Sequence, residues 1–275
     1  MAELRFQKWQ ATGNDFVIID NRNGILTDLS SEWISRICNR NFGVGADGFM
    51  FIQNHPELDF EMKYYNADGL EAEMCGNGAR SIIGFVKNLR IIDNSTTFQA
   101  IDGVHQGWVL RPDYYRIKMV DVDEIIENEK GISLNTGVPH LVIFTEAPDQ
   151  TDVFQLGKEI RYSKEFAPKG SNVNFSNYSD NILRMRTYER GVENETLSCG
   201  TGAVASAIAT EYLNNYGKST YEVQVPGGKL KVSFERTNKN HFQEIYLEGE
   251  AKMVFEGNIK PSVTSMPQPI ARRQY

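Results

Sequence analysis

Two short stretches of this sequence place a cysteine directly before a glycine-rich turn. They are Cys75-Gly76-Asn77-Gly78 and Cys199-Gly200-Thr201-Gly202, and a segment of helical character follows each of them. A cysteine at the N-terminal end of a helix lies near unpaired backbone N–H groups and the positive end of the helix dipole, which predicts a lowered thiol pKa. The glycines let a ligand approach the backbone closely, and the free amides suit a carboxylate. Each stretch could therefore supply an acid or a base beside an anion site.

The two stretches belong to an internal repeat. Thr12-Gly13-Asn14 is echoed by Thr136-Gly137-Val138 at a separation of 124 residues, and the two cysteines have the same separation. Two matches at one separation indicate a duplicated domain, with the join near residues 112–128. Twofold symmetry between the halves would bring the two turns face to face. A carbon held between them could lose a proton to one sulfur and gain one from the other, which inverts a stereocentre.

Strands and a few helices are predicted to position these turns. Residues 59–65, 114–120, 183–188, 221–225 and 229–234 are β-rich and partly alternating, as strands are. Helices are predicted over 79–89 and 203–213, after the cysteines, and over 31–39 with Ser30 or Ser31 as the cap. The 203–213 segment is small and apolar on most faces, which predicts a helix buried inside a sheet.

The bulk properties exclude several classes of protein. At 275 residues the chain is long enough for about two domains. Its 29 basic and 36 acidic side chains give a net charge of −7, and no basic or aromatic stripe suggests a nucleic acid or an anionic membrane as partner. No apolar run approaches the roughly 18 residues of a membrane span, and no signal peptide is apparent. Three cysteines are too few for a disulfide framework, so we expect a cytoplasmic protein with free thiols.

With these residues in view, the sequence closely resembles the diaminopimelate epimerases, which belong to a superfamily of amino-acid racemases and epimerases that work without pyridoxal phosphate. The resemblance runs from about Lys8 to Ile259. The motifs that carry it are Thr12-Gly13-Asn14-Asp15-Phe16, Phe42-Gly43-Val44-Gly45-Ala46-Asp47-Gly48, Asn66-Ala67-Asp68-Gly69, Cys75-Gly76-Asn77-Gly78-Ala79-Arg80, Asn172-Val173-Asn174-Phe175, Glu189-Arg190-Gly191 and Glu195-Thr196-Leu197-Ser198-Cys199-Gly200-Thr201-Gly202.

The resemblance implies a fold and a reaction. The fold class is α/β (α+β), with two pseudo-symmetric domains, each a mostly antiparallel barrel-like sheet around a central helix, and the active site in the interdomain cleft. We expect residues 1–118, completed by a strand near 253–260, to form one domain, residues 119–252 the other, and residues 261–275 a disordered tail. The reaction is epimerisation of LL- to meso-diaminopimelate, for lysine and peptidoglycan precursors, in the cytoplasm and without a cofactor. The expected partner is this small-molecule substrate, and a homodimer is the assembly suggested.

The resemblance also implies roles for individual residues. Cys75 and Cys199 are the acid/base pair, and His140 and Glu189 tune their pKa values. The residues expected to bind substrate are Asn14, Asn66, Gly76, Asn77, Asn172, Glu189, Arg190, Gly200 and Thr201. Two departures stand out: Val138 replaces an asparagine common in the family, and the loop Gly191–Glu195 is one residue longer than usual.

Structural roles compete with some of these assignments. A zinc site would need C-x-x-C spacing or a cluster of His and Cys ligands, so no metal is expected. Cys38, beside Ile34 and Ile37 on a predicted helix, is assigned to packing. His140 could be structural or tuning. A solvated ion pair is the alternative for Glu189-Arg190, and residues 42–48 are interpreted as a structural turn.

Three other functions compete with the leading one. A proline or hydroxyproline racemase does not need to recognise a second amino-acid head. The Glu-Arg pair and the asparagines suggest that this protein does recognise one, which argues against such a racemase. An isomerase of the phenazine type lacks this cysteine pair. An inactive amino-acid-binding module would not need either thiol.

Overall fold

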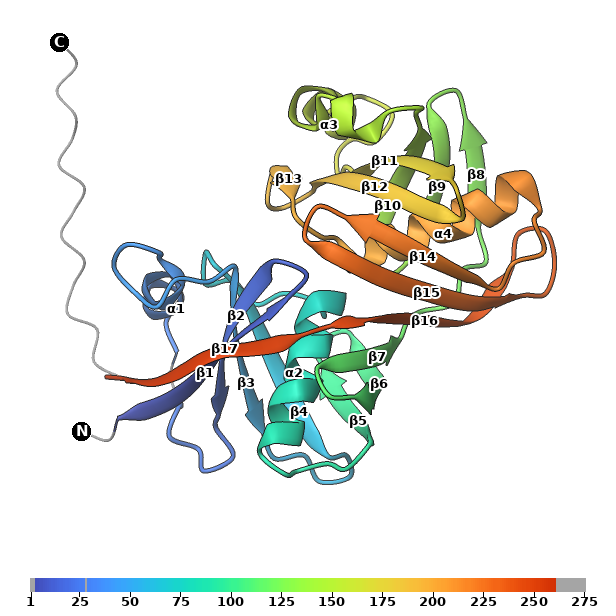
Figure 1. Cartoon of the computed structure of the whole chain (residues 1–275). Helices are drawn as coiled ribbons and strands as arrows, with labels where there is room; N and C mark the ends of the chain where they lie inside the picture. Colours follow the sequence, from blue (N-terminus) through green and yellow to red (C-terminus); the bar gives the residue numbers. More distant parts are fainter. Residues whose placement is uncertain (1–2, 28, 261–275) are drawn as a thin grey trace, which may run out of the picture.

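The chain folds into two lobes of similar build, and the computed structural model describes residues 3–27 and 29–260 (Figure 1). The first lobe contains β1 (Leu4–Ala11), β2 (Asn14–Asp20), β3 (Gly48–Gln53), β4 (Phe60–Asn66), β5 (Ser95–Ala100), β6 (Gly103–Arg111) and β7 (Tyr114–Lys118). The second contains β8 (Ile125–Asn128), β9 (Gly131–Asn135), β10 (Pro139–Phe144), β11 (Asn172–Ser179), β12 (Ile182–Glu189), β13 (Asn194–Thr196), β14 (Thr220–Val225), β15 (Gly228–Arg236) and β16 (Phe242–Glu250). The remaining elements are β17 (Lys252–Ile259), α1 (Ser31–Cys38), α2 (Gly76–Asn88), α3 (Val153–Arg161), α4 (Gly200–Asn214) and a short 3-10 helix, Pro148–Gln150.

Strand pairing repeats from one lobe to the other. In the first lobe β2 pairs with β3, and β4 with β5, in parallel; in the second, β10 pairs with β11, and β12 with β14, in parallel. The other pairings that the structure describes are antiparallel, including β7 with β16, which joins the lobes. The predicted fold class, two similar and mostly antiparallel halves, is confirmed.

The last strand returns to the first lobe. Figure 1 shows β16 and β17 as a nearly continuous ribbon that runs from the second lobe to the edge of the first. There β17 pairs antiparallel with β1, as β8 pairs with β9 in the second lobe. The tail expected at 261–275 lies outside the described residues.

Each lobe encloses one helix. The strands that pack most closely around α2 are β1, β2, β6 and β7, and those around α4 are β10, β11, β12 and β15. The alanines of α4 leave room for the surrounding strands, and Ala203, Ala205, Ala207 and Ala209 are all completely buried. In α2, a Cβ added at Gly84 would lie 2.4 Å from the Trp9 ring, so only glycine lets β1 approach this closely.

The helices after the cysteines begin earlier than predicted. Sequence patterns place their first residues at 79 and 203, but they begin at Gly76 and Gly200. Because the cysteines have extended backbone, each becomes the N-cap of its helix. Elsewhere the prediction is close: α1 covers 31–38 and Ser30 is its cap.

In the part of the chain that the structure describes, none of the helices is long and apolar enough to cross a membrane.

Candidate active site

The N-terminal ends of α2 and α4 meet at two glycines between the lobes. A Cβ added at Gly200 would lie 3.4 Å from the Gly76 Cα and 2.8 Å from the Leu247 Cδ2. A Cβ added at Gly76 would lie 2.9 Å from the same leucine atom and 3.7 Å from the Gly200 Cα. Glycine at both positions therefore lets the two helix ends meet beneath Leu247, because a Cβ at either position would press on that side chain. We call this contact between α2 and α4 the joint. Each cysteine directly precedes one of the two glycines, so Cys75 and Cys199 lie on opposite sides of the joint.

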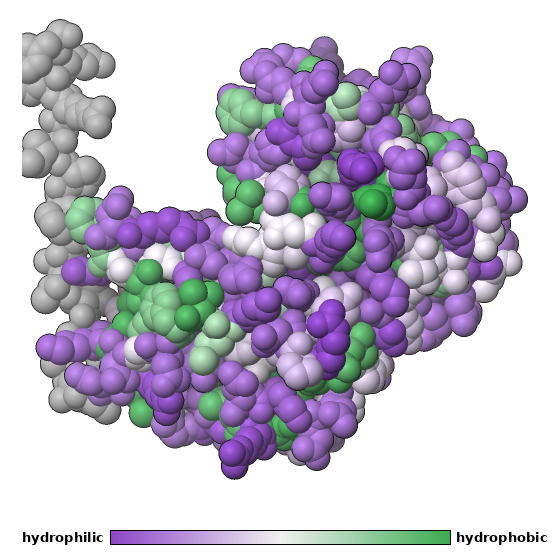
Figure 2. All heavy atoms as spheres, in the orientation of Figure 1, coloured by the Kyte–Doolittle hydropathy of each residue, from purple (hydrophilic) through white to green (hydrophobic). Residues whose placement is uncertain are grey.

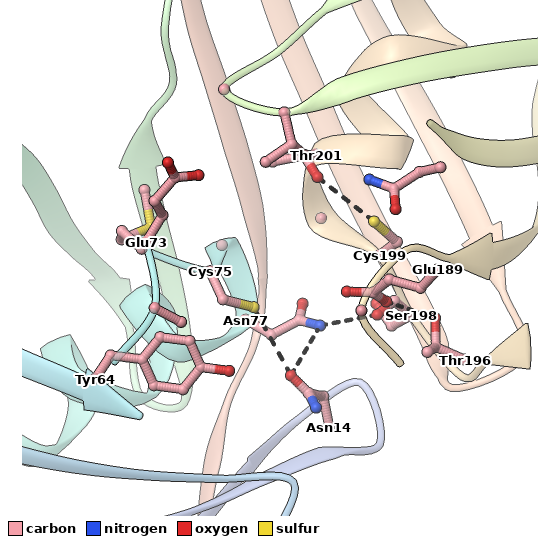
Figure 3. Close-up of a pocket in the computed structure, with 18 of the residues that line it drawn as sticks. Asn14, Tyr64, Glu73, Cys75, Asn77, Glu189, Thr196, Ser198, Cys199 and Thr201 are labelled. Atoms are coloured by element: carbon pink, nitrogen blue, oxygen red, sulfur yellow. Dashed lines mark hydrogen bonds between the residues drawn. The ribbon is translucent and has the colours of Figure 1, made fainter. Parts of the chain in front are cut away.

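Both cysteines line one pocket of about 1170 Å³ between the lobes. In Figure 3, the Cys75 and Cys199 side chains point toward the same space from opposite sides. The predicted binding residues that line the pocket with them are Asn14, Asn66, Gly76, Asn77, Asn172, Glu189, Arg190, Gly200 and Thr201. Val138 lines it as well. The repeat therefore brings together residues that are up to 187 positions apart in the chain.

The Cys75 thiol lies beside an ordered asparagine. Its Sγ is 3.8 Å from the Oδ1 of Asn14, a distance at which the thiol donates a weak hydrogen bond (Figure 3). The same oxygen accepts a hydrogen bond from the Asn77 Nδ2 at 3.4 Å. On its other side Asn14 donates to the Asp47 carboxylate at 2.9 Å. Asn14 is thus held in one orientation, with its carbonyl oxygen toward the thiol.

Cys199 is surrounded by donors from its own helix. The Gly202 N–H donates to its Sγ at 3.4 Å, and the Thr201 Oγ1 lies 3.5 Å from the sulfur. Thr201 is in turn held by Thr136, whose hydroxyl donates to the Thr201 carbonyl at 2.9 Å. Thr136 belongs to the repeat that predicted the symmetry.

The predicted lowering of the thiol pKa values is wrong. Burial raises the pKa of both Cys75 and Cys199, and the charge of Glu189 raises both further. The amides of Asn77 and Gly78 lower the pKa of Cys75, and the Gly202 amide that of Cys199, but these effects are smaller. Loss of water around the sulfurs therefore outweighs the helix ends.

Glu189 and Arg190 are not paired with each other. The Thr196 hydroxyl donates to the Glu189 carboxylate at 2.9 Å, and burial raises the pKa of this glutamate to about 7. The Arg190 N–H donates to the Asn172 Oδ1 at 2.7 Å. No carboxylate of the described residues lies within 4.0 Å of the Arg190 guanidinium. A cation on the pocket wall without an anion is suited to a carboxylate ligand.

His140 is buried behind the wall and does not line the pocket. Its Nδ1 accepts a hydrogen bond from Asn174 at 3.1 Å, and the Asn172 amide lies 3.4 Å from its Nε2. Burial, and then the charge of Arg190, lower its pKa to about 3, so the ring is neutral at physiological pH. Among the contacts described, none joins this ring to either sulfur, so its tuning role stays a prediction.

Sequence reasoning assigned no role to two residues of the pocket wall. Asp47 lies in the stretch interpreted as a structural turn, yet it holds Asn14 in place. The Tyr64 hydroxyl donates to the Asn66 Oδ1 at 3.0 Å and so orients that side chain. The strand register explains the position of Asp47. Asp47 directly precedes Gly48, the first residue of β3, which pairs in parallel with Phe16 of β2, and this brings the Asp47 carboxylate next to Asn14 at the start of β2.

In the part of the chain that the structure describes, no group of three or more His, Cys, Asp or Glu side chains could hold a metal ion.

Solved structures share this fold at low sequence identity. A phenazine biosynthesis protein of the PhzF family from Bacillus anthracis superimposes with a TM-score of 0.75 at 14% identity, covering 94% of this chain and 100% of that one. A probable proline racemase from Agrobacterium radiobacter K84 gives a TM-score of 0.67 at 12% identity, covering 94% and 93%. These likenesses establish the two-lobed fold but do not distinguish among reactions.

Sequence relatives are more specific. A family model described as "Diaminopimelate epimerase" matches residues 6–105 and 132–254. A diaminopimelate epimerase from Flavobacterium psychrophilum is 44% identical over 257 residues, covering 93% of this chain and 100% of the relative. Another, from Aquifex aeolicus, is 37% identical over 285 residues, covering 94% and 99%. The chain therefore belongs to the diaminopimelate epimerase family and is an isomerase.

Proposed function

We propose that this protein interconverts LL- and meso-2,6-diaminopimelate by moving the α-proton between Cys75 and Cys199. The observation that carries the proposal is the joint of α2 and α4, which holds two thiols on opposite sides of one pocket. Inversion at a carbon needs a base on one face and an acid on the other, and each lobe supplies one. Relatives named diaminopimelate epimerase point to the same substrate.

In this mechanism one cysteine acts as thiolate and the other as thiol. The thiolate takes the α-proton, the electron pair passes into the neighbouring carboxylate, and the thiol then delivers its own proton to the opposite face. Each turnover exchanges the protonation states of the two sulfurs. Backbone amides at the N-termini of α2 and α4, at Asn77 and Thr201, are placed to bind the carboxylate as its charge increases.

The distal amino-acid head would meet a separate part of the pocket. Arg190, which lacks a carboxylate partner among the described residues, is suited to its carboxylate, and Asn14, Asn66 and Asn172 to its polar groups. Glu189 lines the same pocket, and its charge acts on both thiols. We propose that it binds an ammonium group as well as tuning the sulfurs. A substrate with a single head, such as proline, would leave this wall unmatched.

We place the reaction in the cytoplasm, in the supply of lysine and of peptidoglycan precursors. We also propose the division into domains of residues 1–118 and 119–252.

We propose in addition that the protein is a homodimer. Apolar side chains gather on the outer face where β17 runs (Figure 2), including the exposed Met253, Val254 and Phe255 of this edge strand. An exposed apolar edge strand favours pairing with a second copy, and the mass in solution measured by light scattering tests this.

The proposed substrate is tested by incubating the protein with LL-diaminopimelate and following formation of the meso isomer by chiral chromatography. We expect conversion without added cofactor and no racemisation of L-proline under the same conditions. Cys75→Ala and Cys199→Ala should each lose at least about 10²–10⁴-fold in rate, because each removes one proton partner. Rapid racemisation of L-proline would contradict the proposed substrate. Full activity in either cysteine variant would contradict the two-thiol mechanism.

A further inference from the structure

A buried arginine without a counter-ion lies at the joint between the lobes. The Arg80 side chain, on α2, is completely buried, and none of the ion pairs in the described part of the chain involves it. Its Nε has no hydrogen-bond partner. Burial lowers its pKa to about 10, which still leaves it charged at neutral pH. A buried charge without a partner is costly, so its presence at this point calls for a function.

The fold makes room for this side chain. A Cβ added at Gly249, on β16, would lie 3.2 Å from the Arg80 Nε and 3.5 Å from its Cζ. Glycine there lets the guanidinium pass between α2 and the strand that connects the lobes. Arg80 thus lies next to the strand that joins the two halves of the active site.

Two hydrogen-bond routes lead from this guanidinium to the segment before Cys199. By one route, Arg80 donates to the Asn77 Oδ1 at 2.7 Å, and the Asn77 Nδ2 donates to the Ser198 carbonyl at 3.0 Å. By the other, it lies 3.3 Å from the Thr12 Oγ1, and the Thr12 hydroxyl donates to the Ser198 Oγ at 2.7 Å. Both routes cross from the first lobe to the second.

A third hydrogen bond ties the arginine to its own helix. Arg80 donates to the Gly76 carbonyl at 3.2 Å, so it also holds the first turn after Cys75. One side chain therefore fixes the backbone next to both thiols.

The charge is not repeated in the second half. The position 124 residues after Arg80 is Val204, which is completely buried on α4. The helix that Cys75 caps thus carries a buried cation at a position where the helix that Cys199 caps carries a valine. Among effects smaller than burial and the charge of Glu189, the Arg80 charge lowers the pKa of Cys75.

The backbone amides of Gly78 and Asn77 also favour the ionised form of Cys75, but the other ionisable side chains near it do not. Glu189, from β12, opposes ionisation of both thiols. Tyr64, from β4, has a pKa raised well above its usual value by burial, so it is neutral. Asp47, Arg40 and Arg190 line the same pocket. Among the charged groups with the largest effects on each thiol pKa, Arg80 is the one cation, and it acts on Cys75.

We propose that Arg80 is a positioning residue that clamps the two helix N-termini together and makes Cys75, rather than Cys199, the first of the two thiols to form a thiolate. The inference rests on the proposed function, because it ranks the two thiols of that reaction by the ease with which each loses its proton.

The test is alkylation of the whole protein with iodoacetamide across a pH series, with peptide mapping to follow each cysteine. Scaling each rate to its own high-pH plateau removes differences in access, so the midpoint of each curve reports ionisation. In the wild type we expect the Cys75 midpoint to lie below that of Cys199. This comparison needs no variant. The reverse order, or equal midpoints, would overturn the proposal.

Variants separate the charge from the clamp. Arg80→Met should raise the Cys75 midpoint by at least about one pH unit, a tenfold slower alkylation at a fixed pH, because a cation nearby is lost. Arg80→Lys keeps the charge but not the forked donors, so the Cys75 midpoint should stay low while kcat falls. Arg184→Met, a control that removes an arginine bonded to Ser179, should leave both midpoints unchanged. Thermal unfolding shows which variants are folded.

If Arg80→Met is folded and its Cys75 midpoint is unchanged, the electrostatic part of the proposal is wrong. If kcat is unchanged in Arg80→Lys, Arg80 does not act as a clamp. If Arg80→Met does not fold, the order of the two alkylation midpoints in the wild type still tests the electrostatic part, and kcat of Arg80→Lys still tests the clamp. Alkylation requires no turnover, so this result is independent of the proposed function. A wild type whose thiols titrate as expected but which does not convert LL-diaminopimelate would contradict the function alone.

Discussion

At the scale of single residues, Glu189 is the group that most affects both thiols apart from burial itself. Its carboxylate raises the pKa of Cys75 and of Cys199, and its own pKa is raised to about 7 by burial. Near neutral pH this side chain is therefore divided between its charged and neutral forms. Protonation of Glu189 below pH 7 removes a negative charge from the thiols and makes them easier to ionise.

Glu189→Gln should imitate the protonated form at every pH. We expect both thiols to be alkylated about tenfold faster at pH 8, equivalent to a pKa lower by about one unit. At the same time kcat/KM for LL-diaminopimelate should fall, because an ammonium partner is lost. Glu195→Gln is a matched control, since Glu195 lines the same pocket but is paired with Arg186 at 2.6 Å. Slower alkylation in Glu189→Gln would reverse the sign argued here.

The sequence predicts the composition of the site better than its electrostatics. The cysteines were found from a repeated motif, which depends only on residue type and spacing, and the asparagines from the resemblance to the family. Arg80, Asp47 and Tyr64 were given no role, because residue type and spacing do not show which side chains these three contact in the fold. The raised thiol pKa values were also missed, because burial of a sulfur depends on the packing of both lobes.

At the scale of elements, the close contact of α2 and α4 is the feature on which the site depends. Sequence patterns predicted both helices but began them three residues late, since glycine is a poor helix former and periodicity starts after it. The missing turn is the one that makes each cysteine an N-cap. Strands were predicted well where apolar residues alternate, as in β14, whose residues are alternately exposed and buried.

Gly200→Ala tests the helix contact. The added Cβ would lie 2.8 Å from the Leu247 Cδ2, closer than van der Waals contact allows, so the Leu247 side chain or the first turn of α4 must shift. We expect kcat to fall by about tenfold or more, because small displacements of catalytic groups are costly. Adding Leu247→Ala removes the nearer clash and should restore part of the loss. Wild-type kcat in Gly200→Ala would show that the contact is not critical.

At the scale of the whole molecule, the two lobes bring together thiols that are far apart in sequence. They are joined by β7 with β16 and by the return of β17 to the first lobe. The duplicated fold could be predicted because the repeat is visible in the sequence. The return of β17 to β1 has a counterpart in the pairing of β8 with β9, but the strand near 253–260 was expected only from the resemblance.

Mild oxidation of the protein tests the approach of the lobes. A small closure of the pocket would bring the two sulfurs to the roughly 2 Å of a disulfide. We expect oxidation to link Cys75 to Cys199 and to abolish activity, with recovery on reduction and protection by substrate. Cys38 is buried away from the pocket, and burial raises its pKa to about 12, so it should stay a free thiol. Peptide mapping that finds a bridge to Cys38 would contradict the convergence of the pair.

The measurement that tests the central claim most directly is epimerisation of LL-diaminopimelate in deuterium oxide, stopped at low conversion and analysed by mass spectrometry. With two thiols on opposite faces, one sulfur removes the original proton and the other delivers deuterium from solvent. The meso product should therefore carry one deuterium at the inverted carbon, while the remaining LL substrate carries none. A product that keeps its original proton would mean that a single base returns it, and the two-cysteine mechanism would be wrong.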